Sequence, residues 1–240
     1  MLEYVNMEQK PGELIRINKY LAQKGIATRR DADKIISAGK VLINGVKAVL
    51  GDKVSNIDNV EILGKSSKKL VYYAYNKPRG VITHSPQRGE KDVLESSKLR
   101  NVFPIGRLDK DSEGLLILTN DGRITERLLG PDYEHEKEYL VKTRHVIKQS
   151  YINIMERGME LEGLMTKPCK AKMLDENSFR IILTEGKKHQ IRRMCDALSI
   201  PIESLKRVRV MNIRLGSLKE NDHREIVGEE LKEFLDSLFK

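Results

Sequence analysis

The sequence predicts an α+β fold, because strand-like and helical segments alternate along most of its 240 residues. The part up to residue 62 holds two short helical segments and a hairpin signal, and no internal repeat follows. Residues 63–70 are rich in Gly, Ser and Lys, which is a linker composition. We therefore expect a polar, flexible tail over 1–13, a small domain over 14–62, and a larger domain over 71–240. The larger domain should contain a mixed, mostly antiparallel sheet with flanking helices.

The small domain should be two helices followed by a hairpin. Apolar residues recur at helical spacing in "IRINKYLAQKG", and the final glycine, Gly25, is the expected stop. Thr28 and Asp31 form a capping pair for a second helix that should end at Gly39. Asn44-Gly45 then joins two β-prone runs, which is a strong hairpin signal.

The charge balance indicates a polyanionic partner. The chain carries 44 basic and 35 acidic residues, a net charge of +9 with a pI near 9.4. Neutralising phosphates releases condensed counterions, so nucleic acid is the partner class that such a charge favours, although solubility alone would also explain it. Basic residues on or beside the two expected helices could hold phosphates near a helix N-terminus, or form a solvated face. They are Arg16, Lys19, Lys24, Arg29, Arg30 and Lys34.

Several protein classes are disfavoured by composition. Two cysteines, Cys169 and Cys195, make no disulfide framework, and the five scattered histidines have no metal-ligand spacing. The N-terminus lacks the apolar core of a signal peptide, and no stretch approaches the ~20 apolar residues of a membrane span. We expect a protein of the reducing cytoplasm, without a metal site and without a membrane association.

The larger domain contains a sequence of clear elements. "KLVYYAYNKPRGVIT" (69–83) predicts two strands around a Pro-Gly turn, and "GLLILT" (114–119) predicts a buried strand. "NDGRITERLLG" (120–130) predicts a turn and a short helix, and "EKEYLVKTRH" (136–145) another strand. The segment 178–200 predicts a strand, a turn and a helix with one apolar stripe, and "SLKRVRVMNIRLG" returns to strand.

The segment "GRLDKDSEG" allows three interpretations. Asp109 could begin a calcium loop, but the twelfth position is Asn120, which cannot be the bidentate Glu that such a loop requires. Asp111, Ser112 and Gly114 could simply form a polar turn. Alternatively, Asp109 is a catalytic carboxylate at the entrance to a buried strand, with a cation two residues before it. The residues alone leave the turn and the catalytic acid equally favoured.

Two family resemblances extend this interpretation. "IRINKYLAQKGIATRRDADKIISAGKVLINGVKA" resembles the S4 RNA-binding domain. "FPIGRLDKDSEGLLILTNDG", with "NKPRG", "HEKEYLV" and "EGKKHQIRRM" in the same order, resembles RNA pseudouridine synthases of the RsuA/RluB/RluE/RluF subgroup, which acts on ribosomal RNA. "HEKEYLV" and "RVRVMNI" are most similar to the RluF type. The resemblance implies an S4 domain ahead of a pseudouridine synthase fold with a central cleft.

The resemblance also implies roles for individual residues. Asp109 matches the catalytic aspartate, which either attacks C1′ or removes a ribose proton, and Arg192 matches the arginine paired with it. Tyr139 matches a tyrosine that packs on the target uracil; because a phenol is a weak base at neutral pH, stacking is its safer assignment. Ile191 matches an aliphatic residue against the base, and Arg107 an arginine that fills the gap left by the extruded uridine.

The remaining implications concern phosphates, partners and cofactors. Lys137, Lys187, Lys188 and Arg193 would hold phosphates, while His189 is expected to be a capping or packing residue. The isomerisation needs no cofactor and no metal. The expected partner is ribosomal RNA, 23S in particular, alone or in a ribosomal assembly particle, with tRNA as an additional candidate and a monomer as the default state.

Three alternatives remain open at this point. The chain could be an S4-type RNA-binding or ribosome-associated protein without catalysis, or a synthase acting on 16S rRNA of the small subunit. A metal-dependent nuclease using Asp109 and Asp111 is the third, but it lacks further ordered acids or histidines to complete a metal shell.

Overall fold

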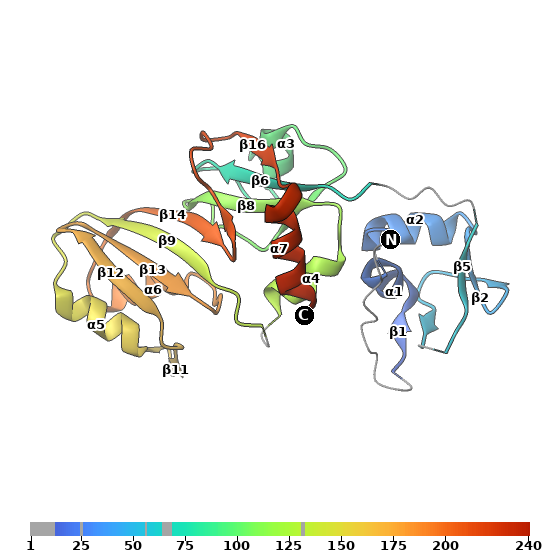
Figure 1. Ribbon diagram of the computed structural model, residues 1–240, viewed down its shortest axis with the longest axis horizontal. Coiled ribbons are helices and arrows are strands. Elements are labelled where there is room, and N and C mark those ends of the chain that lie inside the picture. Colours follow the sequence, from blue (N-terminus) through green and yellow to red (C-terminus); the bar gives the residue numbers. More distant parts are fainter. Residues whose placement is uncertain (1–12, 25, 56, 64–68, 131–132) are drawn as a thin grey trace.

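A computed structural model describes residues 13–24, 26–55, 57–63, 69–130 and 133–240 (Figure 1). The predicted tail, most of the predicted linker and the expected helix stop at Gly25 lie outside these residues. The small domain lies at one end of the molecule and the large domain makes up the rest, with α7 running across its middle.

The small domain follows the predicted helix–helix–hairpin order. Its elements are β1 (Ile15–Arg16), α1 (Ile17–Gln23), α2 (Arg29–Ser37), β2 (Val41–Ile43), β3 (Val46–Lys47), β4 (Lys53–Val54) and β5 (Val60–Ile62). Thr28 Oγ1 accepts a hydrogen bond from the Asp31 amide at 3.1 Å and so caps α2. Asn44 and Gly45 both have positive φ, 50° and 82°, as a tight hairpin turn requires. The domain has its own aliphatic core, built around Ile17, Leu21 and Ile36.

The large domain alternates strands and helices in a longer series. Its elements are β6 (Tyr72–Lys77), α3 (Val93–Ser97), β7 (Phe103–Ile105), β8 (Glu113–Thr119), α4 (Arg123–Leu129), β9 (Lys137–Thr143), α5 (Gln149–Arg157), β10 (Glu160–Leu161), β11 (Leu164–Met165), β12 (Lys170–Asp175), β13 (Ser178–Leu183), α6 (Gln190–Ala197), β14 (Ile202–Val210), β15 (Ile213–Arg214), β16 (His223–Glu225) and α7 (Gly228–Phe239).

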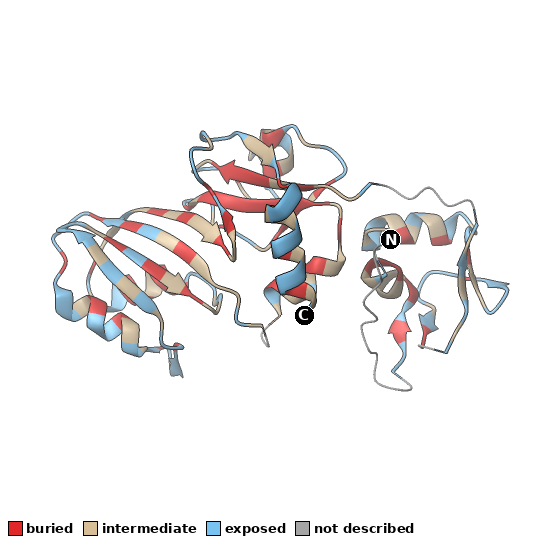
Figure 2. Cartoon of the chain, in the orientation of Figure 1, coloured by how far each residue is buried: buried red, intermediate tan, exposed pale blue. Residues whose placement is uncertain are grey.

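One nine-stranded sheet organises this domain, with seven strands in the order β12-β13-β9-β14-β8-β6-β16. The other two strands lie off this order: β15 pairs with β14, and β7 pairs with β8. The sheet is mixed but mostly antiparallel, as predicted: β14 and β8 pair in parallel, and the other neighbours pair antiparallel. Buried residues concentrate along the neighbouring strands β6 and β8 (Figure 2).

The sheet forks between β8 and β14. These strands pair at only two positions, Lys206 with Glu113 and Arg207 with Gly114. Beyond them, β8 takes β7 as its neighbour on that side, whereas β14 takes β15. Leu115, the first residue of β8 past the fork, has its carbonyl bonded by the guanidinium of Arg207 at 2.8 Å. The strands diverge from here, and a cleft can open between the two halves of the domain.

Each half of the sheet has its own core. Leu115, Ile117 and Phe234 belong to the core under α4 and α7, on the side of β6 and β8. Phe179 and Met194 belong to a second core, in which α5 and α6 pack on the side of β9 and β13. The predicted apolar stripe of α6 is confirmed, because Ile191, Met194 and Cys195 are buried.

Two local expectations were wrong. Residues 81–83 form no strand after the Pro78-Gly80 turn; the segment makes one isolated bridge, between Ile82 and Asp92. Gly114 does not belong to the polar turn but to strand β8, with φ of 105°. A Cβ at this position would lie 2.2 Å from the Arg207 carbonyl oxygen, so the glycine is required by the close approach of β14.

Candidate active site

The loop between β7 and β8 presents Asp109 at the fork of the sheet. The Ser112 amide donates to the Asp109 carbonyl at 3.0 Å, which closes a turn over 109–112. Buried Leu108 is fixed at both backbone groups by Thr83: its amide donates to Oγ1 at 3.1 Å, and its carbonyl accepts from Oγ1 at 2.6 Å. The Asp109 side chain remains 35% exposed. The turn and the carboxylate interpretations are therefore compatible, because the turn holds the acid toward solvent.

Lys77, at the end of β6, supports this turn from beneath. Its side chain is fully buried, and Nζ donates to the carbonyls of Ser112 at 2.7 Å, Pro78 at 3.0 Å and Lys110 at 3.5 Å. Burial lowers the pKa of Lys77 to about 8, against the opposing effect of the acids Asp109, Asp111 and Glu113. The Lys77 ammonium thus connects the end of β6 and Pro78 to two residues of the turn, Lys110 and Ser112.

Two side chains from the start of α6 reach the carboxylate of Asp109. Arg192 Nε lies 4.0 Å from Oδ2, and its Nη2 donates to the Asp111 carbonyl at 3.0 Å and to Ser112 Oγ at 3.1 Å. Arg192 therefore contacts both the acid and the turn that carries it. His189 Nε2 lies 3.3 Å from Oδ1.

His189 does not have the capping role expected from the sequence. It occupies the N-cap position of α6, with φ of 52°, but its side chain makes no capping hydrogen bond. The imidazole instead points to Asp109. The capping expectation was wrong because a residue at a helix start can also face across to a neighbouring loop.

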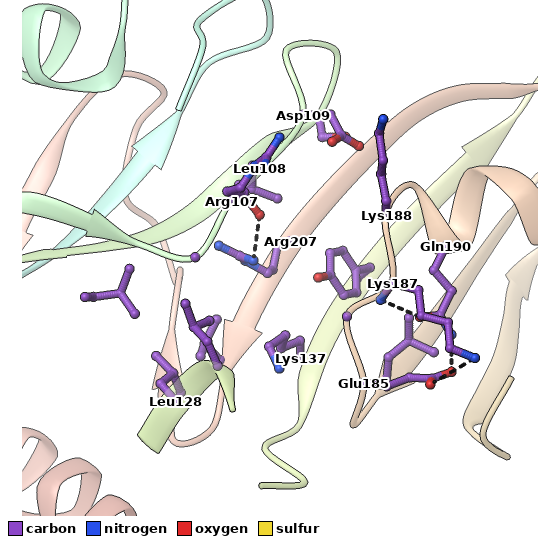
Figure 3. A pocket seen from close by; sticks show the side chains of 18 of the residues that line it. Arg107, Leu108, Asp109, Leu128, Lys137, Glu185, Lys187, Lys188, Gln190 and Arg207 are labelled. Carbon is purple, nitrogen blue, oxygen red and sulfur yellow. Dashed lines mark hydrogen bonds and ion pairs between the residues drawn. The ribbon is translucent and has the colours of Figure 1, made fainter. Parts of the chain in front are cut away.

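The Asp109 loop borders a cleft of about 930 Å³. Its walls come from both halves of the sheet, and they include six site residues predicted from the sequence besides Asp109: Arg107, Lys137, Tyr139, Lys187, Lys188 and Ile191. Tyr139 is partly buried and packs against the core of α5 and α6 and against a further buried cluster that includes Tyr75, Leu108 and Leu116. Figure 3 shows Asp109 and Lys188 at one side of this cleft and Lys137 and Arg207 farther along it.

Two of the predicted phosphate-binding residues have other partners. Lys187 lines the cleft, but its Nζ donates to the Met165 carbonyl at 2.7 Å and lies 3.5 Å from Glu185. Arg193 does not line the cleft at all: it pairs with Glu162 of the β10–β11 turn at 2.9 Å. Arg193 is the residue that the structure does not bring to the site, because one helical step turns it away from Arg192.

The predicted basic residues of the small domain lie mostly at its surface. Arg16, Arg29, Arg30 and Lys34 are exposed and Lys19 is partly buried; Lys34 pairs with Asp31 at 3.1 Å. Burial first, then Arg107 and Arg30, lower the pKa of His84 at the cleft wall, while a hydrogen bond with the Gly106 backbone opposes them.

Two functional candidates escaped sequence reasoning. Lys77 lies within "NKPRG", where the resemblance assigned it no role, and Arg207 lies within "RVRVMNI". Both are buried cations, a residue type that is rarely buried without a structural or chemical role. The available signal was a basic residue inside an otherwise strand-like run, but alternation alone does not distinguish a buried position from an exposed one.

Among the residues that the structure describes, no group of three or more His, Cys, Asp or Glu side chains is arranged to hold a metal ion. None of the described helices combines the length and the apolar character needed to cross a bilayer.

Comparisons with known proteins agree with this geometry. The family model described as RNA pseudouridylate synthase matches residues 71–197, and the S4 domain model matches residues 15–58. The chain belongs to the RNA pseudouridine synthases. It is 39% identical to the dual-specificity RNA pseudouridine synthase RluF of Escherichia coli strain K12, over 92% of this chain and 78% of that protein. These matches place it in the RsuA/RluF subgroup.

Two further relatives extend the match. The ribosomal large subunit pseudouridine synthase B of Bacillus subtilis is 37% identical, over 90% of this chain and 94% of that protein. A crystal structure of a pseudouridylate synthase superimposes with a TM-score of 0.68 at 27% identity, covering 93% of this chain and 99% of the other. The synthase therefore has the predicted architecture, an S4 domain followed by a catalytic domain, and acts on RNA.

The activity of a pseudouridine synthase defines what this cleft must do. The N1–C1′ bond of a uridine breaks, the base turns within the pocket, and C5 bonds to C1′. The cleft must admit a uridine extruded from RNA, because C1′ is inaccessible in a stacked nucleotide.

Proposed function

We propose that the enzyme converts a specific uridine of 23S ribosomal RNA to pseudouridine, with Asp109 as the catalytic carboxylate. The observation that supports this most directly is the position of Asp109, held at the cleft wall by Arg192 and by the Lys77-bound turn. The relative from Bacillus subtilis is named for the large ribosomal subunit, which favours 23S over 16S rRNA.

We assign the other cleft residues by their places around Asp109. Tyr139, which lines the cleft, packs on the uracil, and Ile191 closes the pocket from α6. Arg192, with Nε 4.0 Å from Oδ2 of Asp109, positions the carboxylate at the cleft. Arg107, exposed and two residues before Asp109, occupies the space that the extruded base leaves in the RNA stack.

We infer that different segments of the chain have different roles. Residues 14–62 bind structured RNA through Arg16, Lys19, Arg29, Arg30 and Lys34. Residues 63–70 connect this domain to the catalytic domain over 71–240. Lys188 contacts phosphate at the cleft. The enzyme works as a monomer in the cytoplasm.

The proposal is tested with wild type and Asp109→Asn on unmodified 23S rRNA, 16S rRNA and tRNA in the presence of EDTA, followed by mapping of pseudouridine. Wild type should modify one site in 23S rRNA, and the Asn variant should bind the RNA without forming product. Product from the Asn variant at the wild-type rate would remove Asp109 from catalysis. Binding without product from either protein would favour a passive RNA-binding role, and EDTA-sensitive cleavage a nuclease.

The same assay tests the choice of RNA. Product in 16S rRNA but not in 23S rRNA would refute the large-subunit assignment. The relative named RluF is described as dual-specificity, so product in tRNA as well as in 23S rRNA would extend the assignment to a second RNA. Comparison of naked 23S rRNA with assembly particles identifies the form on which the enzyme acts.

A further inference from the structure

Two cations, the buried Arg207 and the partly buried Lys137, lie beside Tyr139 on one face of the sheet. Arg207 of β14 is the direct cross-strand partner of Tyr139 of β9, and residues directly opposite on an antiparallel pair share a face with Cβ atoms about 5 Å apart. Lys137 lies two residues before Tyr139 on the same strand and therefore on the same face. All three side chains line the cleft. A base packed on Tyr139 would have a cation on two of its sides.

The structure holds the Arg207 side chain in place. Arg207 is 5% exposed; its Nε donates to the Leu115 carbonyl at 2.8 Å, and its Nη1 lies 3.5 Å from the Arg107 carbonyl (Figure 3). These two bonds use two of the five N–H donors of a guanidinium, so donors remain available toward the cleft. The second bond also connects Arg207 to the loop that carries Asp109.

The positive charge of this pair has no counterion in the described part of the chain. Lys137 Nζ donates only to the His135 carbonyl, at 3.1 Å, and neither cation forms an ion pair there. Burial first, and then the charge of Arg207, lower the pKa of Lys137. The other cleft acid, Glu185, is engaged by Gln190 and Lys187. A buried cation and a partly buried one that lie close together without an acid are a site prepared for an anion.

We propose that Lys137 and Arg207 form a subsite that holds the negative charge of the detached uracil during the reaction. This rests on the proposed function, in which Asp109 reacts and Tyr139 carries the base. A nucleotide phosphate is the competing anion. The phosphates stay joined to the rest of the RNA and meet the exposed part of the cleft wall, to which Lys188 and Arg107 belong, whereas the base enters beside the partly buried Tyr139. The position of the pair next to Tyr139 thus favours the base.

The chemistry requires such a site in either route open to Asp109. When the N1–C1′ bond breaks, its electron pair stays on N1, and the uracil becomes an anion with charge spread over N1 and its carbonyl oxygens. C1′ gains a bond to the carboxylate, or the ribose loses a proton to it. C5 of the base then donates an electron pair to C1′, while the carboxylate either leaves C1′ or returns its proton to the ribose. C5 finally loses its proton as N1 gains one, and the base is neutral again. The charge on the base is transient, and fixed donors directed at transient charge accelerate a reaction.

Single-turnover kinetics on unmodified 23S rRNA separates the two anions. We expect Lys137→Gln to lower the saturated rate of pseudouridine formation by about a hundredfold, as for the loss of one donor to a developing charge, and to change the RNA Kd less than threefold. Arg207→Gln should act in the same way. Lys137→Arg and Arg207→Lys should each react at least tenfold faster than the corresponding Gln variant, because they keep the charge.

The matched control is Lys206→Gln. Lys206 precedes Arg207 on β14 and faces the opposite side of the sheet, where its Nζ lies 3.9 Å from Oε1 of Glu113. The saturated rate of Lys206→Gln should stay within twofold of wild type. Melting curves of all variants exclude unfolding as the cause of a lower rate. A tenfold weaker Kd with an unchanged saturated rate in Lys137→Gln would overturn the proposal in favour of a phosphate anchor. An unchanged rate and Kd would also overturn it.

Wild type and Asp109→Asn are measured in the same series. If wild type forms no pseudouridine, or if Asp109→Asn forms as much as wild type, the proposed function itself fails. If both behave as proposed but neutralisation of Lys137 has no effect on rate, only the uracil subsite fails.

Discussion

Lys77 offers a sharp test of how the turn that carries Asp109 is supported. The perturbation is Lys77→Met, which keeps the length and apolar stem of the side chain and removes the buried ammonium. In the wild type this ammonium donates to three backbone carbonyls around the Asp109 turn. The variant therefore removes both a buried charge and the donors that hold the turn.

The pH dependence of stability follows from the pKa of this group. The unfolded chain holds the Lys77 proton up to its ordinary pKa of 10.5, whereas in the folded protein burial lowers that pKa to about 8. Between these values the unfolded state binds more protons than the native state, so the contribution of Lys77 to stability rises with pH. A gap of roughly 2.5 units corresponds to about 3 kcal/mol, absent below pH 8 and complete above 10.5.

The measurement is urea unfolding followed by circular dichroism from pH 7 to 10.5. As the pH rises across this range, the free energy of unfolding of the wild type should increase by about 3 kcal/mol relative to that of Lys77→Met. The control is Lys172→Met, an exposed position on β12, whose difference from wild type should not change with pH in the same way. If the difference in free energy of unfolding between wild type and Lys77→Met does not change with pH, or changes in favour of the variant, Lys77 is not a buried lysine with a lowered pKa.

Two further predictions concern the backbone. Gly114→Ala places a Cβ 2.2 Å from the Arg207 carbonyl oxygen at φ of 105°, so we expect a loss of at least about 3 kcal/mol in urea unfolding. Gly163→Ala, with φ of 79° and nothing within 4 Å, should cost only about 1 kcal/mol; equal losses would show that the fork is not closely packed. Thr28→Ala removes the cap of α2 and should lower the opening free energy of that helix, measured by hydrogen exchange, by about 1 kcal/mol. Thr28→Ser keeps the capping hydroxyl and should leave this free energy unchanged.

Local signals predicted local structure well. The Asn44-Gly45 turn, the Thr28 cap and the apolar stripe of α6 each depend on residues close in sequence, and each is present in the structure. The motif resemblance predicted the fold class, because four ordered segments together are more specific than any one of them. The Asp109 loop was also located correctly as the entrance to a buried strand.

The contacts between distant segments could not be predicted in this way. Gly114 was assigned to a turn because polar neighbours precede it, whereas its role depends on β14, more than ninety residues later, as the Leu115–Arg207 contact also does (sequence separation 92). Lys77 and Arg207 look like ordinary basic residues in strands, and only the fold reveals that they are buried. His189 was misjudged for the same reason, since its partner Asp109 lies on another element.

The fork of the sheet has a consequence for how this enzyme family can diversify. Main-chain pairing at Glu113 and Gly114 sets the start of β8, and the loop bearing Asp109 hangs directly from it. The outer turns, such as Glu162-Gly163 between β10 and β11, are not part of that pairing. A change of RNA target can therefore proceed by exchanging or lengthening peripheral turns, while the main-chain pairing that positions the Asp109 loop stays unchanged.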